Sequence, residues 1–258
     1  MVAGLLIIFA LSALSNALLM YIIAHFEKTK RALNLFFLCL AVFDFLFTLT
    51  LLFLAVEFLY HFNCVFGEAA FKIIKGAFFT GQSGGLVLLT AMTLDRFCTA
   101  VLNAWRPLTQ TVSFARVLCV TTWIFSMAAS LRYLLLPENY EYYSLYLPSG
   151  GLGYIMEDVF LFLIPLVIIV SCYRCILRTV LSMPHTRDRR RKLMLLFSHI
   201  AAFVVCFVPY NVLVCYKRFY GMSGCDANYE MLYLTSYILA RSYCVVNPLL
   251  GLACSHTV

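Results

Sequence analysis

Seven long apolar runs, separated by short polar stretches, take up almost the whole chain. Each run is long enough to cross a bilayer, because a hydrocarbon core about 30 Å thick needs about 20 residues of helix. Backbone groups inside lipid must form hydrogen bonds within their own segment, so we expect helices rather than open strands. We therefore predict an all-α membrane protein, a seven-transmembrane helix bundle that forms a single domain over residues 1–258. The runs lie near residues 3–25, 34–60, 71–100, 117–136, 153–180, 193–216 and 229–254.

The composition excludes an ordinary water-soluble domain. Hydrophobic residues make up 63% of the chain and charged residues 12%, whereas soluble domains have about 45–50% apolar and about 25% charged residues. The lipid bilayer is therefore the expected surroundings of most of the surface. The net charge of +7 comes from basic residues that lie mainly beside the apolar runs. Because no basic surface with interleaved aromatic residues is visible, we do not expect a nucleic-acid partner.

The basic residues also predict the direction of the chain. If the N-terminus is outside, most of them fall on the inner side, including the clusters at 28–31 and 187–192. By the positive-inside rule we predict a multi-pass protein of the plasma membrane with its N-terminus outside and its C-terminus in the cytoplasm. The acidic residues of the outer connections in this arrangement are mainly Glu68, Glu138, Glu141, Glu157 and Asp226.

Asp44 lies deep in the second run, where a carboxylate in hydrocarbon costs at least about 2.5 kcal/mol. It should therefore face the interior of the bundle and have hydrogen-bond partners. Asn16 in the first run and Asn247 in the seventh are the candidate partners. A functional polar core is one interpretation, and a neutral acid that only joins helices is the other.

Arg241 is the least ordinary residue of the seventh run, because it lies near the outer third of an otherwise apolar helix. A guanidinium in this position needs an anion. Glu57, near the outer end of the second run, is one candidate partner, and an acidic group of a ligand is the functional alternative. The sequence does not decide between them.

The third run ends with Asp95-Arg96-Phe97, where Arg96 can pair with Asp95 or extend into water. Three residues of this kind usually mark only a charged helix end. Their place at the inner end of the third run is what gives them weight.

Three prolines interrupt the later runs, at Pro165 in the fifth, Pro209 in the sixth and Pro248 in the seventh. Each proline removes a backbone hydrogen bond and weakens the helix locally. Such a point is either a hinge or a static kink, and the three prolines alone do not separate these interpretations.

Taken together, these features resemble the rhodopsin-like, or class A, G-protein-coupled receptors, with one signature in each run and in the same order. The resemblance covers almost the whole chain, and seven ordered signatures are far more specific than any one of them. They are Asn16, Asn34-Leu35 with Asp44, Asp95-Arg96-Phe97, Trp123, Pro165 with Tyr173, Phe203 to Pro209, and Asn247-Pro248.

Within that family the chain looks most like a chemokine receptor, with the XC-type branch as a candidate nearest relative. The entry to the third run resembles this group, and similar stretches precede the fourth run, end the fifth and lie within the sixth. These stretches are Phe66-Gly67 with Phe71-Lys72-Ile73, Gly76 and Gly81, Thr111-Val112-Ser113-Phe114, Cys172 to Thr179, and Val208-Pro209-Tyr210-Asn211.

The resemblance implies a receptor rather than an enzyme, with no catalytic residues, no metal site and no cofactor. Its partners would be an extracellular chemokine-like peptide or protein and a heterotrimeric G protein, which an outward movement of the sixth span would activate. The ligand-binding residues that it implies are Glu57, Lys75, Gln82, Asp158, Tyr210, Tyr237 and Arg241. The residues implied for G-protein coupling and switching are Asp95, Arg96, Tyr173, Phe203, Phe207, Pro209, Asn247 and Pro248, and those of the polar core are Asp44, Asn16 and Asn247.

Some positions depart from the family pattern. Phe71 stands where relatives have the cysteine of an outer disulfide, which leaves Cys64 and Cys225 as the outer thiols for another bridge. Gly85 replaces a hydroxyl residue that usually helps the carboxylate of the second span to hold sodium. This replacement argues against a sodium ion at Asp44.

The stretch after Pro248 lacks the tyrosine that relatives carry three residues later, and the segments before the first span and after the seventh are short for the group. These departures favour an alternative, a receptor-like protein that binds or scavenges a ligand without signalling. A receptor for a small anionic ligand that contacts Arg241 is a second alternative. A transporter or membrane enzyme has the least support, because no repeated pair of broken helices, metal triad or catalytic arrangement stands out.

Overall fold

The computed structural model describes residues 2–27, 32–60, 66–102, 111–135, 162–182, 184, 187–220 and 227–255. Over these residues the elements are all helical, with seven long helices and no strand. The predicted fold class, an all-α seven-helix bundle, is confirmed. The helices are α1 (Val2–Ile22), continued by the π-helical η1 (Ile23–Glu27), α2 (Ala32–Leu59), α3 (Gly67–Phe97), continued by η2 (Cys98–Leu102), α5 (Val112–Leu134), α7 (Ile164–Leu181), α8 (Arg187–Tyr220) and α9 (Ala227–Ser255).

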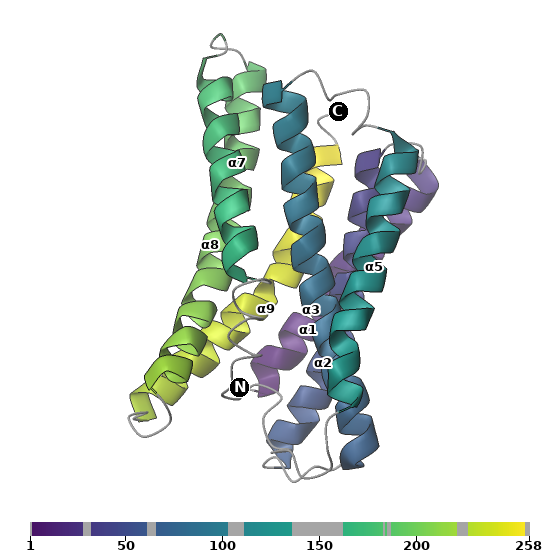
Figure 1. Cartoon of the computed structure of the whole chain (residues 1–258), viewed down its shortest axis with the longest axis vertical. Helices are drawn as coiled ribbons and strands as arrows, with labels where there is room; N and C mark the ends of the chain where they lie inside the picture. The colour runs from purple at the N-terminus through teal and green to yellow at the C-terminus, as the bar shows by residue number, and fades with distance from the viewer. Residues whose placement is uncertain are drawn as a thin grey trace.

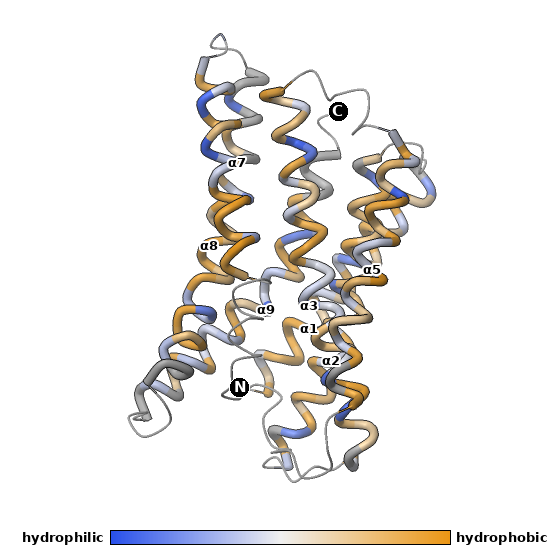
Figure 2. The backbone as a smooth tube through the Cα atoms, in the orientation of Figure 1, coloured by the Kyte–Doolittle hydropathy of each residue, from blue (hydrophilic) through white to orange (hydrophobic). Residues whose placement is uncertain are grey.

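The helices run side by side along the long axis of the molecule, and the start of α1 and the end of α9 lie at opposite ends (Figure 1). α3 packs against α2, α5 and α7, while α9 packs against α1 and α8. Among the described residues, six helices are long and apolar enough to cross a membrane, namely α1, α2, α3, α5, α7 and α8. Figure 2 shows hydrophobic residues along much of their length. α9 differs because it carries the buried polar residues Arg241 and Asn247.

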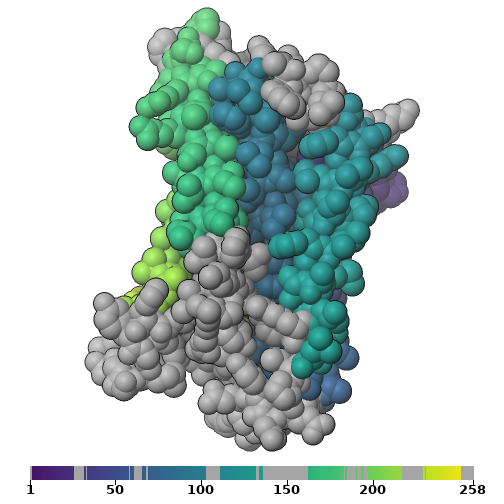
Figure 3. Space-filling view, viewed as in Figure 1, coloured from purple at the N-terminus to yellow at the C-terminus, as the bar shows by residue number. Residues whose placement is uncertain are grey.

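The outer face of α5 illustrates why the bundle belongs in lipid. Val117, Val120, Ile124 and Met127 recur at helical spacing, and each is more than half exposed. α5, in teal, lies on the outer surface of the bundle in Figure 3. In water this stripe would be a contiguous apolar patch of the kind that soluble monomers avoid, so it is a surface for contact with acyl chains.

Two glycines bring α3 unusually close to α2. A Cβ added to Gly81 would lie 2.7 Å from Cβ and 3.0 Å from Cα of Phe47, and one added to Gly84 would overlap the ring of Phe43. That ring is held from its other side, since it stacks on Trp123 with 4.1 Å between ring centres. Small residues let helix backbones approach closely in a membrane, and here they set the spacing of two walls of the bundle.

The fifth span differs from the sequence prediction. The predicted run begins at residue 153, whereas α7 begins at Ile164, and residues 151–161 lie outside the described part of the chain. Pro165 lies in the first turn of α7 rather than inside it. Because residues 162 and 163 are themselves helical and residues 151–161 are not described, the prediction that Pro165 interrupts the fifth span stays a prediction. Pro209 and Pro248, by contrast, lie inside α8 and α9.

Candidate ligand pocket and polar core

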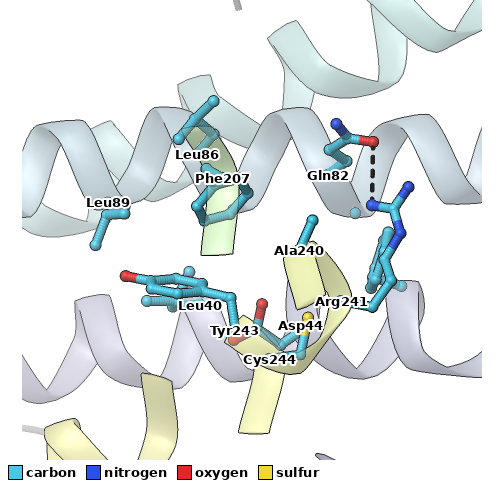
Figure 4. Close-up of a pocket in the computed structure, with 13 residues that line it drawn as sticks. Leu40, Asp44, Gln82, Leu86, Leu89, Phe207, Ala240, Arg241, Tyr243 and Cys244 are labelled. Carbon is cyan, nitrogen blue, oxygen red and sulfur yellow. Dashed lines mark hydrogen bonds between the residues drawn. The ribbon is translucent and has the colours of Figure 1, made fainter. Parts of the chain in front are cut away.

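A cavity lies in the middle of the bundle, between α2, α3, α8 and α9 (Figure 4). Two charged residues line it, Asp44 from α2 and Arg241 from α9. Figure 4 shows the Arg241 side chain directed toward Gln82 of α3 and away from Asp44. A ligand in the cavity would therefore contact a charged side chain at two separate places, Asp44 and Arg241. The other lining residues are Leu40, Phe47, Gly81, Gln82, Gly85, Leu86, Leu89, Phe207, Ala240, Tyr243 and Cys244.

Arg241 is held in a cage of aromatic rings. It is 2% exposed and lies at the centre of α9, deeper than the outer third that the sequence suggests. Its guanidinium carbon lies 4.6, 4.4 and 4.2 Å from the ring centres of Phe47, Phe78 and Tyr237, and 5.5 Å from that of Tyr210. A desolvated cation over an aromatic face gains about 2 kcal/mol. The cage therefore offsets much of the cost of a charge in hydrocarbon, which is at least about 2.5 kcal/mol.

The hydrogen bonds of Arg241 use only one side of the guanidinium. Nη1 donates to Oε1 of Gln82 at 3.5 Å. Nε and Nη2 are buried and neither makes a hydrogen bond of ordinary geometry among the described residues, although the Tyr237 hydroxyl also interacts with the guanidinium. Since a buried donor without an acceptor costs about 1–3 kcal/mol, these two nitrogens favour an acceptor beside them.

Glu57 is not the partner of Arg241 within the described part of the chain, so that alternative is wrong. The guanidinium covers the ring of Phe47, and Glu57 lies ten positions further along α2, about 15 Å along the helix axis. Glu57 is itself buried near the C-terminal end of α2. The sequence alone could not show this, because it does not give the height of α9 relative to α2.

Asp44 forms the centre of a buried polar core. Asn247 donates its side-chain amide to Oδ2 of Asp44 at 2.9 Å, although the two residues are 203 positions apart. Asn16, the other predicted partner, instead donates to the backbone carbonyl oxygens of Ser12 at 2.9 Å and Cys244 at 3.1 Å. Of the two predicted contacts to the carboxylate, the structure therefore contains the one from α9.

Short hydroxyl contacts extend the polar core to a third helix. Ser12 Oγ lies 2.7 Å from Thr48 Oγ1, and Thr48 donates to the backbone carbonyl of Asp44 at 2.5 Å. Ser12 Oγ also lies 3.4 Å from the carbonyl oxygen of Cys244. These contacts join α1, α2 and α9 through buried residues, where a hydrogen bond is electrostatically stronger than in water.

An aromatic cluster lies next to the cavity, where the predicted switch residues meet. The ring of Phe207 lies 5.1 Å from that of Phe203 and 4.8 Å from that of Tyr243. Phe203 and Tyr243 belong to one apolar cluster with Tyr173 of α7 and Leu86 of α3. The cluster thus contacts four helices, and it lies between the cavity and the end of the bundle that holds the last turn of α3.

The other predicted residues are spread along the bundle. Gln82 lines the cavity, but Lys75 lies two turns nearer the start of α3, with its Nζ 5.7 Å from the ring centre of Phe71. Asp95 and Arg96 lie in the last turn of α3, at the opposite end. Residues outside the described part of the chain are Asp158 of the ligand set, the outer thiols Cys64 and Cys225, and the predicted outer acids Glu138, Glu141, Glu157 and Asp226.

Phe47 and Phe78 are the site residues that sequence reasoning missed. Both rings contact the guanidinium of Arg241 and lie 5.2 Å from each other. The chain contains 23 phenylalanines, most of them in apolar runs. Nothing in the sequence separates these two from the others, although their positions on α2 and α3 decide where Arg241 is held.

Comparison with known proteins agrees with this architecture. Residues 15–250 match the family described as "7 transmembrane receptor (rhodopsin family)". The chain is also 29% identical over 266 aligned positions to the C-X-C chemokine receptor type 1 of Rattus norvegicus. That alignment covers 95% of this chain and 74% of the rat protein, so the similarity extends through the whole bundle.

Proposed function

Because the chain belongs to the rhodopsin family of seven-transmembrane receptors, we propose that it binds an extracellular chemokine-like peptide or protein and activates a heterotrimeric G protein. The observation that carries this proposal is the central cavity, whose wall includes Phe207 of α8. Phe207 contacts Phe203 of its own helix and Tyr243 of α9. A ligand in the cavity would therefore act on the residues that hold α8 in place.

The step from ligand to G protein would be an outward movement of the inner half of α8, which is a shift between two packings of one bundle. Pro209 weakens α8 about two thirds of the way along its length. Beyond the proline, Tyr229 of α9 donates its hydroxyl to the backbone carbonyl of Leu213 at 2.6 Å. We expect this bond to keep the segment of α8 after Pro209 packed on α9, while the segment before Pro209 moves.

The proposed inner face is the end of the bundle that holds the last turn of α3 and the start of α8. Arg96 lies in that turn of α3, and exposed Arg178 and Arg190 lie at the adjoining ends of α7 and α8. Figure 2 shows hydrophilic residues at these ends of α7 and α8. Positive charge on this side supports a cytoplasmic C-terminus and an N-terminus outside the plasma membrane. An epitope at residue 258 that antibodies reach on intact cells would contradict this orientation.

The test is to measure ligand binding and nucleotide exchange on the same preparation. A panel of chemokines is added to the receptor in nanodiscs with a G protein, and at least one should bind and accelerate exchange. Arg96→Ala should reduce the stimulated exchange to the basal rate while ligand affinity stays within about threefold, a difference below about 1 kcal/mol. Binding to the unmodified chain without exchange would reject the signalling function and support the scavenging alternative. The sequence Leu249-Leu250-Gly251, without a tyrosine, is the observation that favours that alternative.

We also propose that the polar core works without a sodium ion. Position 85 lies beside Asp44, because an ideal Cβ there would be 3.8 Å from Oδ1. Since this residue is a glycine, it has no side chain that could bind a sodium ion. Asn247 donates a hydrogen bond to Asp44. Arg241 already places a positive charge on the same cavity, which disfavours a sodium ion there. Exchange of sodium chloride for potassium chloride at equal ionic strength should change the melting temperature by less than about 1 °C, well below 1 kcal/mol of stability. A sodium-specific rise of several degrees would contradict this.

A further inference from the structure

We infer that Arg241 binds a carboxylate group of the ligand, as the anchor of an anion site within the central cavity. The inference rests on the proposed function, because it assigns a chemistry to the ligand that this cavity would hold. Arg241 is 2% exposed, and two of its nitrogens have no hydrogen-bond partner in the described part of the chain. A buried cation with unused donors is a binding site for an anion rather than an ordinary helix contact.

The two guanidinium nitrogens without hydrogen bonds indicate which kind of anion Arg241 would bind. Nε–H and one N–H of Nη2 point in parallel from the same edge of a guanidinium, and this edge matches the two oxygens of a carboxylate. In Arg241 these are the two nitrogens without partners, while Nη1 donates to Gln82. The aromatic rings of Phe47, Phe78 and Tyr237 lie against the guanidinium and help to fix its plane. The edge that remains for a ligand is therefore the bidentate one.

The acidic side chains that the structure describes do not occupy this edge. Asp44 lines the same cavity but accepts a hydrogen bond from Asn247, and Arg241 is directed away from it (Figure 4). Glu57 lies ten positions beyond Phe47 on α2, and Asp95 lies in the last turn of α3. Since none of these described acids fills the edge, we assign the carboxylate to the ligand. The apolar rings around the site favour a carboxylate on a slim apolar body, such as an acidic side chain or a small aromatic acid.

The inference can be tested with a matched pair of small probes. 3-Phenylpropionate carries a carboxylate on an aromatic body, and 3-phenylpropionamide has nearly the same shape without the charge. Each is titrated at constant ionic strength into the purified chain in nanodiscs, and the melting temperature is followed by intrinsic fluorescence. Since a ligand that binds only the folded state raises its melting temperature, the acid should give a saturable rise of several degrees. The amide should bind at least tenfold more weakly.

Three variants separate the site from general charge effects. Arg241→Gln should lower the affinity for 3-phenylpropionate by at least tenfold, and Arg241→Lys, which keeps the charge without the parallel donors, should give an intermediate loss. Arg116→Gln removes an exposed arginine of α5 and should bind like the unmodified chain. Equal binding of acid and amide, or an unchanged affinity in Arg241→Gln, would overturn the inference. If Arg241→Gln does not fold, equal affinity in Arg241→Lys would overturn it instead.

The outcome is independent of whether the chain signals. The titration contains no G protein, so a chain that binds 3-phenylpropionate through Arg241 without stimulating exchange would keep the carboxylate site and lose only the signalling function. Conversely, stimulated exchange by a chemokine together with no response to 3-phenylpropionate would keep the receptor function and reject the carboxylate site.

Discussion

Gly81→Ala is expected to destabilise the receptor by about 1–3 kcal/mol, the usual cost of an overpacked core, and to lower its melting temperature by about 5 °C. The added Cβ would lie 2.7 Å from Cβ of Phe47 and 3.0 Å from both its Cα and its backbone nitrogen. A side chain could rotate away from such a contact, but a helix backbone cannot. The methyl group must therefore push α2 and α3 apart along the wall that holds Asp44 and the ring of Phe47.

Gly76→Ala provides the matched control, because it is the same substitution on the same helix. The nearest atom to its added Cβ is the carbonyl oxygen of Ser130, at an ordinary contact distance of 3.9 Å. Alanine favours helix over glycine by about 1 kcal/mol, so Gly76→Ala should keep or raise the melting temperature. If both variants melt alike in nanodiscs, α2 and α3 are not packed as closely as described.

Asn247→Leu is expected to destabilise the chain by about 2–3 kcal/mol, because it leaves a buried carboxylate without its hydrogen-bond donor. Asn247 donates to Asp44 at 2.9 Å in a region where both residues are almost fully buried. The melting temperature should therefore fall by about 5 °C or more, and less of the receptor should reach the cell surface.

The double variant Asp44→Leu with Asn247→Leu shows whether the loss comes from this hydrogen bond. When both partners of a buried pair become apolar, no unsatisfied group remains, so the double variant should be more stable than Asn247→Leu alone. A double-mutant cycle measures the coupling between the two sites. Additive losses would mean that Asp44 and Asn247 act separately and that the described contact contributes nothing.

The features predicted best from the sequence are those fixed by the solvent. Apolar runs of about 20 residues must form helices in lipid, and a buried carboxylate must find a partner. For that reason the contact between Asp44 and Asn247 could be anticipated across 203 positions. The seven helices follow from the same constraint.

The features that could not be predicted depend on the relative height and rotation of helices. The aromatic cage around Arg241 requires Phe47 and Phe78 to face the same point from α2 and α3. A Phe-rich apolar run carries little information on which ring faces inward. Because the sequence does not give the relative height of the helices, Glu57 could be considered as a partner of Arg241.

Two polar side chains of α1 join the first helix to the last, and they differ from their α9 partner in how freely the residue type can change. Asn16 and Ser12 contact the main-chain oxygen of Cys244 and not its thiol. Because every residue type supplies that oxygen, position 244 can change to alanine or serine without loss of these hydrogen bonds. The hydrogen bonds depend on the side chains of Asn16 and Ser12, so relatives should keep these two α1 residues. The residue at position 244 of α9 should be free to vary.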